Sequence, residues 1–394
     1  MLSYDDALNT VTMYARTFPP SIEEIPLEEA YGRVVAEEVI SDRNYPPFHR
    51  SAMDGIAIKA DDVSEGITSF RIKATILAGQ STEGLAFDKG DAVKIMTGAA
   101  VPDGLDAVIR REDCEFQDDT VKVTAGSARF FQNIAIKGED APARAVLMPQ
   151  GKYIDHSDMG LLSTFGYAKV KVHKQPKVGI IITGNEIKAP DEPVSPYEIR
   201  DSNSFHLIGM LAKYGVRPHK VQRCKDDQDA IAAAIENTSA CDIVLLTGGV
   251  SMGEADFVPQ LLEQGGIRKV FHKTAIKPGK PMWFGVKGNE RAVFGLPGNP
   301  LSTQVTFSLY VKPFLHELFR SPLHYTMYPL DKRLENKKPI DVFVPVSINH
   351  MGCLRTHRSN GSGDITASLD TAGLVHLSPD SSYGAGDYMS LIPW

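Results

Sequence analysis

The hydrophobic pattern of the chain changes near Pro176. Beyond this residue, continuous apolar runs of strand length alternate with segments whose apolar residues recur at helical spacing. The runs predict buried strands over 177–183, 216–223, 242–246, 281–286 and 292–296, and the helical segments are 201–214, 226–237, 256–264 and 301–319. Such alternation is typical of a doubly wound parallel sheet with helices on both faces.

The residues on either side of this segment follow other patterns. Residues 3–18 predict an amphipathic helix that is capped by Ser3 and Asp6 and ends at Pro19. A short helix is expected near 27–31, strands over 34–40 and 151–154, and a small helix over 157–164. Short β-type runs separated by Gly and Asp lie at 55–59, 70–77, 92–95, 107–110 and 120–124, and the residues after 322 are also β-rich.

These patterns predict four domains. The proline-broken stretch 42–48 marks one boundary, and the helical pattern stops near Pro322. The expected domains are a mixed domain of residues 1–41 and 140–175, an inserted β-rich domain over 42–139, a catalytic α/β domain over 176–322 and a C-terminal β domain over 323–394. The predicted fold class is therefore α/β plus β-rich domains, with a doubly wound parallel sheet in the catalytic part.

Composition narrows the functional classes. A chain of 394 residues is usually too long for a single hydrophobic core, so several domains are expected. Its composition, with 42% hydrophobic and 23% charged residues, is typical of a globular protein. The net charge of −7 argues against nucleic acid as the main partner. No apolar run is long enough to span a membrane, no signal peptide is apparent, and the four scattered cysteines form no CxxC, so we expect a cytoplasmic protein with reduced thiols.

The stretch Asp242–Asp256 is the most informative single segment. Its strand is followed by residues with little side-chain bulk, namely Thr247, Gly248, Gly249, Ser251 and Gly253. Backbone N–H groups of such a loop can approach an oxyanion closely, and a helix expected to begin near Asp256 adds the positive end of its dipole. A single turn of this kind would indicate only a strand-to-helix connection. Because other strands end in similar loops, we interpret this sheet edge as a ligand site.

Acidic residues follow the same strands. Glu186 lies after the strand 177–183, and Asp226 follows the strand 216–223. If the strand ends share one edge, Glu186, Asp226 and Asp256 surround a single crevice. Clustered carboxylates beside phosphate-sized loops suit Mg²⁺, which takes few protein carboxylates and keeps waters and phosphate oxygens. Asp226 and Asp256 are equally suited to cap helices, and the two roles can coexist.

Three lysines, Lys273, Lys277 and Lys280, lie in a segment that Pro278 and Pro281 keep out of any helix. These lysines can therefore point together at an anion. Lysines are usually solvated surface charges, but the Pro-Gly scaffold favours anion binding here.

The inserted domain carries three tight turns, Ser51–Gly55, Ile95–Gly98 and Gly138–Asp140. Each alone indicates little beyond turn chemistry. No GxSxG, HExxH or GxxxxGK[ST] pattern occurs, and the eleven histidines show no metal-ligand spacing. Serine hydrolases, zincins and P-loop enzymes are therefore disfavoured.

Together these segments resemble one family, the molybdopterin molybdenumtransferases of molybdenum cofactor synthesis, which includes the E domain of gephyrin. The resemblance covers nearly the whole chain. It is carried by Ser51–Gly55, Met96–Gly98 with Asp106–Val108, Gly138–Asp140, Thr183–Glu186, Asp201–Asn203, Gly248–Ser251 with Asp256, Lys277–Pro281 and Gly295–Pro300. The α/β segment alone also resembles the MoaB/Mog-like adenylyltransferases of the pathway and CinA-like proteins, and the Ser51–Gly55 insert indicates the molybdenumtransferase branch.

The resemblance implies a homodimer with a crevice between the α/β domain of one copy and the inserted domain of the other. It implies a Mg²⁺-dependent reaction that takes adenylylated molybdopterin and molybdate and releases AMP. Molybdopterin adenylyltransferase and molybdoenzyme apoproteins become candidate partners. Carried over by motif, the catalytic residues are Asp54, Asp140, Lys273, Lys277 and Lys280; the substrate-binding residues are Thr97, Gly248, Gly249, Ser251, Asp256, Pro297, Pro300 and Ser362; and the metal ligands are Glu186 and Asp226.

This chain departs from the family pattern at several positions. Asn185 replaces an acid, Ala135 and Pro345 replace arginines, Ile56 replaces an aromatic residue, and Arg144 replaces a glycine. The arginine expected at 345 is the one that the resemblance assigns to molybdate. Two other interpretations therefore stay open: a binding or scaffold paralog with weakened turnover, and a CinA-like hydrolase of a nucleotide pyrophosphate.

Overall fold

A computed structural model describes residues 1–394 except 125, 250–256 and 358. The chain forms two compact units. The first comprises Met1–Glu37, Gln150–Met159 and Lys169–Trp394, and the second comprises Glu38–Pro149 and Gly160–Ala168. This division is coarser than the four domains expected from the sequence, whose boundaries stay a prediction.

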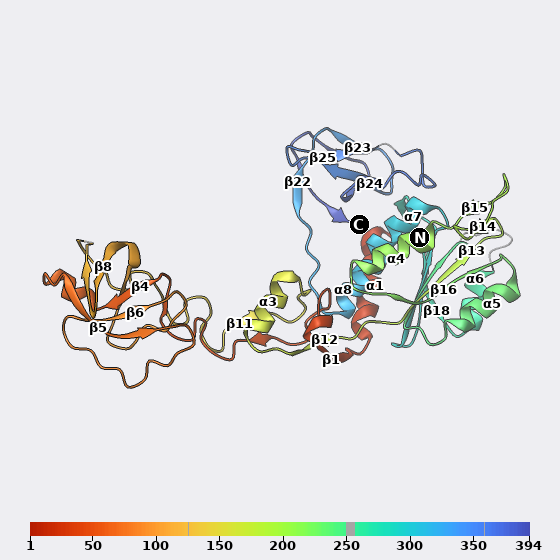
Figure 1. Cartoon of the computed structure of the whole chain (residues 1–394). Helices are drawn as coiled ribbons and strands as arrows, with labels where there is room; N and C mark the ends of the chain where they lie inside the picture. Colours follow the sequence, from red (N-terminus) through yellow and green to blue (C-terminus); the bar gives the residue numbers. More distant parts are fainter. Residues whose placement is uncertain (125, 250–256, 358) are drawn as a thin grey trace. The chain divides into compact units, whose positions relative to one another are not determined.

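A six-stranded sheet forms the centre of the first unit (Figure 1). Its strands, in spatial order, are β16 (Pro218–Cys224), β13 (Val178–Thr183), β17 (Ile243–Thr247), β21 (Arg291–Leu296), β20 (Trp283–Lys287) and β18 (Arg268–His272). The first four strands are parallel, which confirms the predicted doubly wound sheet in this part. The strand β20 pairs antiparallel with β21, because the short turn 288–290 between them forms a hairpin and cannot hold a crossover helix, and β18 pairs antiparallel with β20.

Helices cover both faces of this sheet. They are α4 (Asn203–Ala212) and α7 (Pro300–Thr306) on one face, and α5 (Gln228–Asn237) and α6 (Val258–Gln264) on the other. Side chains alternate across a strand, so Ile180 and Ile182 pack in the cluster that contains α4 and α7, whereas Ile181 packs with α5 and α6. Burial on both faces explains why the central strands have continuous apolar runs.

The N-terminal helix α1 (Tyr4–Thr17) confirms the helix predicted over 3–18. Ser3 caps it, since its Oγ accepts the backbone N–H of Asp6 at 3.1 Å and donates to Asp6 Oδ2 at 2.6 Å. The buried residues of α1 are Tyr4, Ala7, Val11 and Ala15, which recur at helical spacing. They join the same core as α4 and α7.

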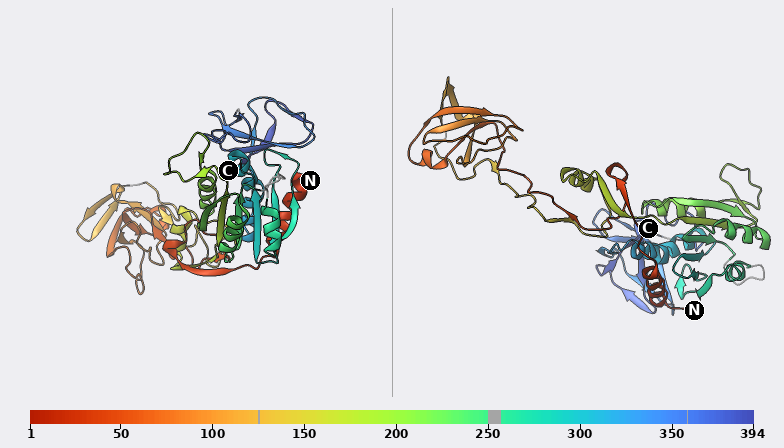
Figure 2. Two further views of the ribbon diagram at one scale, coloured as in Figure 1. Left: turned by 90° about the vertical axis from the view of Figure 1, so that its right-hand side faces the viewer. Right: turned by 90° about the horizontal axis from the view of Figure 1, so that it is seen from below.

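The C-terminal β-rich residues are built around β24 (Asp341–Ile348). It pairs with β26 (Gly373–Leu377), β25 (Leu354–Thr356) and the two-residue strand β19 (Ile276–Lys277). Because β19 belongs to the lysine segment, its parallel pairing with β24 attaches the tail strands to the α/β layer. The views in Figure 2 show these strands, drawn blue, beside that layer.

The helix predicted over 301–319 is present but not uniform. It consists of α7, a π-helical segment Phe307–Val311 and α8 (Lys312–Leu318). Pro313 has no N–H to give to the carbonyl of Leu309, four residues earlier, which favours a local change of register. Every residue of the π-helical segment is buried, so the segment has no exposed polar face from which a helical period could be read. The sequence pattern therefore did not indicate this change.

The second unit contains a mixed six-stranded sheet. Its strands, in spatial order, are β7 (Ala107–Arg110), β4 (Gly55–Ile58), β6 (Asp91–Ile95), β5 (Ser69–Ile76), β9 (Thr120–Val123) and β8 (Cys114–Gln117). Five of these strands confirm the predicted β-type runs, with ends that differ by about one residue. The edge strand β8 was missed, because two of its four residues are exposed and polar. The helix α3 (His156–Thr164), predicted over 157–164, spans the boundary between the units.

Three local predictions were wrong. The helix near 27–31 is only a 3₁₀ turn, Leu27–Glu29, and the strand over 34–40 is reduced to β2 (Val39–Ile40) with isolated bridges at Val34 and Val35. The strand over 151–154 is a single bridge at Tyr153. There Gly151 adopts a φ of +83°, which a regular strand cannot contain. A Cβ at this position would also lie 2.2 Å from the carbonyl oxygen of Arg320. No helix among the described residues is long and apolar enough to cross a membrane.

Lys312 provides a test of core electrostatics. It is 1% exposed, its Nζ donates to the carbonyl of Pro393 at 2.5 Å, and burial lowers its pKa to about 7. The unfolded chain keeps this proton to about pH 10, so the unfolding free energy should rise with pH from about 7 to about 10. We expect Lys312→Met to lose this contribution, whose limiting slope is about 1.4 kcal/mol per pH unit.

Denaturant unfolding at several pH values between 7 and 10 measures this slope. The matched control is Lys332→Met, which removes an exposed lysine that is not among the groups that shift the pKa of Lys312. The control should keep the wild-type slope. A wild-type slope in Lys312→Met would show that Lys312 is not deprotonated in the folded chain near neutral pH.

Candidate functional site

The register of the parallel strands places several loops at one sheet edge. Thr183 at the end of β13 lies opposite Cys224 of β16, and Ile182 lies opposite Thr247 of β17. Thr247 in turn lies opposite Leu296 of β21. The loops that follow these four strands therefore begin at the same level, which is where ligands bind in open α/β sheets.

The loop after β17 requires glycine at two positions. Gly248 and Gly249 have φ values of +88° and +60°. A Cβ on Gly248 would lie 2.6 Å from both the carbonyl oxygen and Oγ1 of Thr183, and one on Gly249 would lie 2.8 Å from Val258 Cγ2. The loop thus packs directly on the end of β13. Ser251 and Asp256, predicted to belong to this site, lie outside the described residues.

Buried polar atoms gather beneath this loop. Asn203 donates from Nδ2 to the carbonyl of Gly298 at 2.7 Å, and its Oδ1 has no hydrogen-bond partner among the described residues. Thr183 Oγ1 is also buried and has no hydrogen-bond partner among the described residues. Unsatisfied buried oxygens are costly, so these two oxygens, which have no partner among the described residues, mark this edge as a candidate ligand site.

The two predicted metal ligands follow neighbouring strands. Glu186 lies three residues beyond Thr183 and Asp226 two residues beyond Cys224. The loops are tied by a hydrogen bond of 3.2 Å from the backbone N–H of Asp226 to Asn185 Oδ1. Asp226 does not cap α5, because Asp227 does so by accepting the N–H of Ala230 at 2.9 Å. The cap interpretation of Asp226 is therefore wrong.

Asp226 Oδ1 is buried and has no partner among the described residues. Within the described ranges, no three Asp, Glu, His or Cys side chains are grouped to hold a metal. Magnesium commonly uses only one or two protein carboxylates together with phosphate oxygens, so this pair of acids fits it.

A cavity of about 940 Å³ opens beside the same edge, all of it within the first unit. Six predicted site residues line it, namely Gly248, Gly249, Lys277, Lys280, Pro297 and Ser362. Gly298 and Asn299 of the Gly295–Pro300 motif also line it, as does Pro345, where the family pattern has arginine. The sequence did not indicate His357 and Ser359, nor the apolar residues Ile340, Val342, Phe343 and Val344. One wall therefore belongs to the α/β layer and the other to the C-terminal strands.

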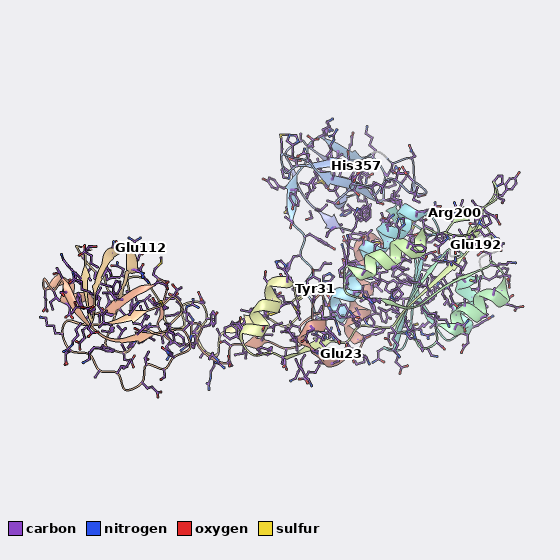
Figure 3. The ribbon with its side chains drawn as sticks, viewed as in Figure 1. Glu23, Tyr31, Glu112, Glu192, Arg200 and His357 are labelled. Atoms are coloured by element: carbon purple, nitrogen blue, oxygen red, sulfur yellow. The ribbon has the colours of Figure 1, made fainter. Side chains whose placement is uncertain are left out.

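Polar contacts join or brace these two walls. Asn299, the residue before α7, donates from Nδ2 to Ser362 Oγ at 2.7 Å. His357, labelled in Figure 3, donates its backbone N–H to the carbonyl of Pro345 at 3.0 Å, and its Nε2 lies 2.8 Å from Ser347 Oγ. Pro345, where the family pattern has arginine, is thus part of the cavity wall and is hydrogen-bonded to the backbone of His357.

The lysine segment is only partly in the cavity. Lys277 lies in the extended strand β19, as its position before Pro278 predicted, and Lys280 also lines the cavity. Lys273 lies outside the residues that line the cavity. It has a φ of +73°, unusual for a lysine, and its backbone N–H donates to the carbonyl of Met282 at 2.7 Å. Pro300 is the first residue of α7 and also lies outside the cavity lining.

The remaining predicted residues belong to the second unit. Asp54 Oδ1 accepts both the backbone N–H and the Oγ1–H of Thr97, at 2.7 and 2.8 Å, and these hydrogen bonds lower the pKa of Asp54. Asp140 donates its backbone N–H to the carbonyl of Tyr45 at 3.1 Å. It stays a prediction that residues of this unit act together with the cavity of another copy of the chain. Arg144 has a φ of +67°, the conformation that a glycine at this position would adopt readily.

Comparison with known proteins agrees with this geometry. Residues 2–166 match the family described as MoeA N-terminal region (domain I and II), and residues 179–317 match the probable molybdopterin binding domain. The molybdopterin molybdenumtransferase of Haemophilus influenzae is 36% identical over 83% of this chain and 81% of its own length, and that of Bacillus subtilis is 33% identical over 83% and 78%. The chain belongs to the molybdopterin molybdenumtransferase family.

A solved structure supports the same conclusion. The molybdopterin biosynthesis moeA protein of Pyrococcus horikoshii OT3 superposes with a TM-score of 0.83 at 29% identity, covering 99% of this chain and 100% of that one. The predicted family, fold class and transferase character of this molybdenumtransferase are therefore confirmed.

The close packing of the glycine loop gives a direct test of the site. Gly248→Ala combines an unfavourable φ with a clash against Thr183. The matched control is Gly288→Ala, because Gly288 has a φ of +58° and no atom within 4 Å of a Cβ. We expect the control to lose about 1–2 kcal/mol of stability from the left-handed backbone alone, and Gly248→Ala to lose clearly more and to lose nucleotide binding. Equal losses of stability and unchanged binding would show that the loop does not pack as described.

Proposed function

We propose that this molybdenumtransferase inserts molybdate into adenylylated molybdopterin and releases AMP in a Mg²⁺-dependent reaction. The observation that carries the proposal is that buried oxygens without a hydrogen-bond partner among the described residues lie at the sheet edge beside which the lysine-lined cavity opens. Thr183 Oγ1, Asn203 Oδ1 and Asp226 Oδ1 lie at or beside the carboxyl edge of the sheet. Lys277 and Lys280 line the adjoining cavity.

In this proposal, the chain acts mainly by positioning its substrates. The Gly248–Gly249 backbone approaches phosphate oxygens without side-chain obstruction. Lys277 and Lys280 attract the molybdate dianion into the cavity, and Ser362, held by Asn299, offers its hydroxyl to an oxyanion. The apolar strand β24 excludes water from one side, which strengthens these charge interactions.

Glu186 and Asp226 would hold the magnesium ion. When bound, the ion would neutralise charge on the phosphate groups. Asn185 retains a role in this part of the site, because its Oδ1 fixes the backbone of Asp226. The replacement of an acid at 185 therefore removes one charge but keeps the loop in place.

A weakened binding paralog is the second candidate function. One observation favours it, namely that Pro345 lines the cavity where the family pattern has arginine. A proline offers neither charge nor N–H, so the bidentate contact that an arginine makes with an oxyanion is absent. Introducing Pro345→Arg should tighten molybdate binding.

We also propose that the chain acts as a homodimer in the cytoplasm, with Asp54, Thr97 and Asp140 completing the crevice of a second copy. The motivation is that the acidic turn at Asp54 is exposed and well ordered by Thr97. Light scattering that gives a monomer at micromolar concentration would exclude this arrangement. Molybdopterin adenylyltransferase and molybdoenzyme apoproteins are proposed as partners that supply the substrate and receive the product.

The reaction is tested by AMP release from adenylylated molybdopterin, with and without molybdate. We expect molybdate-dependent release by the wild type. Lys277→Ala should lower it at least tenfold while nucleotide binding is kept. Lys287→Ala, an exposed lysine outside the cavity lining, is the matched control and should behave as wild type. Release that does not depend on molybdate would favour the nucleotide pyrophosphate hydrolase, and no release at all would favour the binding paralog.

The metal assignment is tested by titrating Mg²⁺ calorimetrically with nucleotide present. We expect Asp226→Asn and Glu186→Gln each to weaken binding roughly tenfold or more, because each removes one of two carboxylate ligands. Asp227→Asn is the matched control, since asparagine also caps helices and only the charge is lost. Wild-type affinity in both site variants would place the metal elsewhere.

A further inference from the structure

The cavity contains one imidazole that no motif predicted, that of His357. It lines the cavity directly, as do Lys277 and Lys280. Among the described residues of the lining, these three are the ones that can carry a positive charge, and none is an aspartate or a glutamate. A dianion that enters therefore meets no like charge from the described lining, which favours an anionic ligand.

The register of the C-terminal sheet determines the face on which His357 lies. Val346 of β24 lies opposite Thr356 of β25. One step further along, the backbone N–H of His357 donates to the carbonyl of Pro345 at 3.0 Å, so the ladder continues through this pair. Residues directly opposite each other in an antiparallel pair place their side chains on the same face. The imidazole therefore lies on the face of β24 that carries Pro345.

A side-chain contact agrees with this placement. His357 Nε2 lies 2.8 Å from the Oγ of Ser347, which is two residues beyond Pro345 and so shares its face. Phe343 lies on this face too and belongs to the core cluster of the α/β layer, whereas Val346 packs in the separate cluster of the C-terminal strands. The imidazole is therefore on the face that turns towards the α/β layer.

The contact with Ser347 leaves the other ring nitrogen for a ligand. Nδ1 of His357 has no hydrogen-bond partner among the described residues. A hydroxyl can both donate and accept, so Ser347 can hold Nε2 whether or not Nε2 carries a proton. Nδ1 can then carry a proton in the neutral ring as well as in the cationic ring, and this N–H can be donated to an oxyanion.

The residues after His357 continue the polar wall. Ser359 and Ser362 also line the cavity. Asp364 braces the loop that carries them, because its Oδ2 accepts the backbone N–H of Asn360 at 2.8 Å. The C-terminal wall thus presents hydroxyl groups and an imidazole to one space, on a backbone that is already held in place, which lowers the ordering cost of binding.

We propose that His357 contacts an oxyanion in this cavity and donates its Nδ1–H to a tetrahedral dianion bound between the C-terminal strands and the α/β layer. It lies directly across the strand pair from Pro345, so it supplies from the neighbouring strand a donor that proline lacks. The inference deepens the proposed function and rests on it only for the identity of the natural ligand. Molybdate and a substrate phosphate group share this chemistry, and the experiment separates them.

The test measures binding of inorganic molybdate and inorganic phosphate to the full chain by calorimetry. His357→Phe keeps a ring in the cavity wall and removes both nitrogens. We expect it to weaken binding of the preferred anion roughly tenfold, as for the loss of one hydrogen bond to a charged group. The matched control is His350→Phe, because His350 is exposed and lies outside the cavity lining, and its affinity should stay within about twofold of wild type.

A second variant separates contact with the ligand from bracing of the wall. Ser347→Ala removes the partner of Nε2 but leaves Nδ1 in the cavity. Its loss of affinity should be clearly smaller than that of His357→Phe. Equal losses in these two variants would show that the imidazole acts only through its bond to Ser347 and would overturn the inference.

Pro345→Arg adds a readout that a structural role would not move. The introduced guanidinium would lie on the same face as His357 and reach the same anion. Pro345→Arg should therefore restore most of the affinity lost in His357→Phe, and its gain there should exceed its gain in the wild type. Equal gains in the two backgrounds contradict a shared anion site.

The two anions identify the source of the ligand. A larger effect of His357→Phe on molybdate than on phosphate indicates the oxyanion substrate, and the reverse indicates a substrate phosphate. Equal behaviour of His357→Phe and His350→Phe, or no binding of either anion to the wild type, overturns the inference.

The two proposals fail separately. Oxyanion binding that depends on His357 without AMP release leaves the inference standing and removes the reaction. Molybdate-dependent AMP release whose KM for molybdate is unchanged in His357→Phe removes the inference and keeps the reaction.

Discussion

The parallel register of β13 and β17 is the constraint on which the rest of this structure depends. It brings the end of β17 so close to Thr183 that only glycine fits at 248. The strand β16 pairs with the other side of β13, so the loops that carry Glu186 and Asp226 begin at neighbouring strand ends. A shift by one residue would turn the buried faces of these strands over and disperse the site together with the core. Packing and ligand chemistry are therefore specified by the same hydrogen-bond ladder.

The second wall of the cavity depends on a much smaller element. Only Ile276 and Lys277 pair with β24, yet this pairing joins the α/β layer to the C-terminal strands. Contacts from Asn299 to Ser362 close the same junction at another point. The two walls therefore have different supports: the sheet edge holds the glycine loop, and the shorter junction positions Lys277. Lys277 belongs to both parts, because it is at once a strand residue and a cavity residue.

The sequence predicted most of the α/β layer, because strands buried on both faces and amphipathic helices leave clear periodic signals. It also predicted the glycine loop and the lysine segment, whose residue types are chemically unusual for their positions. It did not predict that His357 lines the cavity, since a histidine just after a short tail strand carries no local signal. The position of His357 depends on the pairing of β25 with β24, which places Thr356 opposite Val346. The Asp226 cap failed for a related reason, as two adjacent aspartates compete and backbone geometry selects Asp227.

The two outer strands of the six-stranded sheet have a consequence for solubility and assembly. A free strand edge is a template for pairing with another chain. Here β16 begins with Pro218, which lacks an N–H, and continues through Lys220 and Arg223, while β18 begins with Arg268 and Lys269. A proline and charged side chains on an edge strand disfavour edge-to-edge pairing between copies. This sheet therefore resists growth into aggregates, and any association of two copies has to use side-chain surfaces and not the open backbone of these strands.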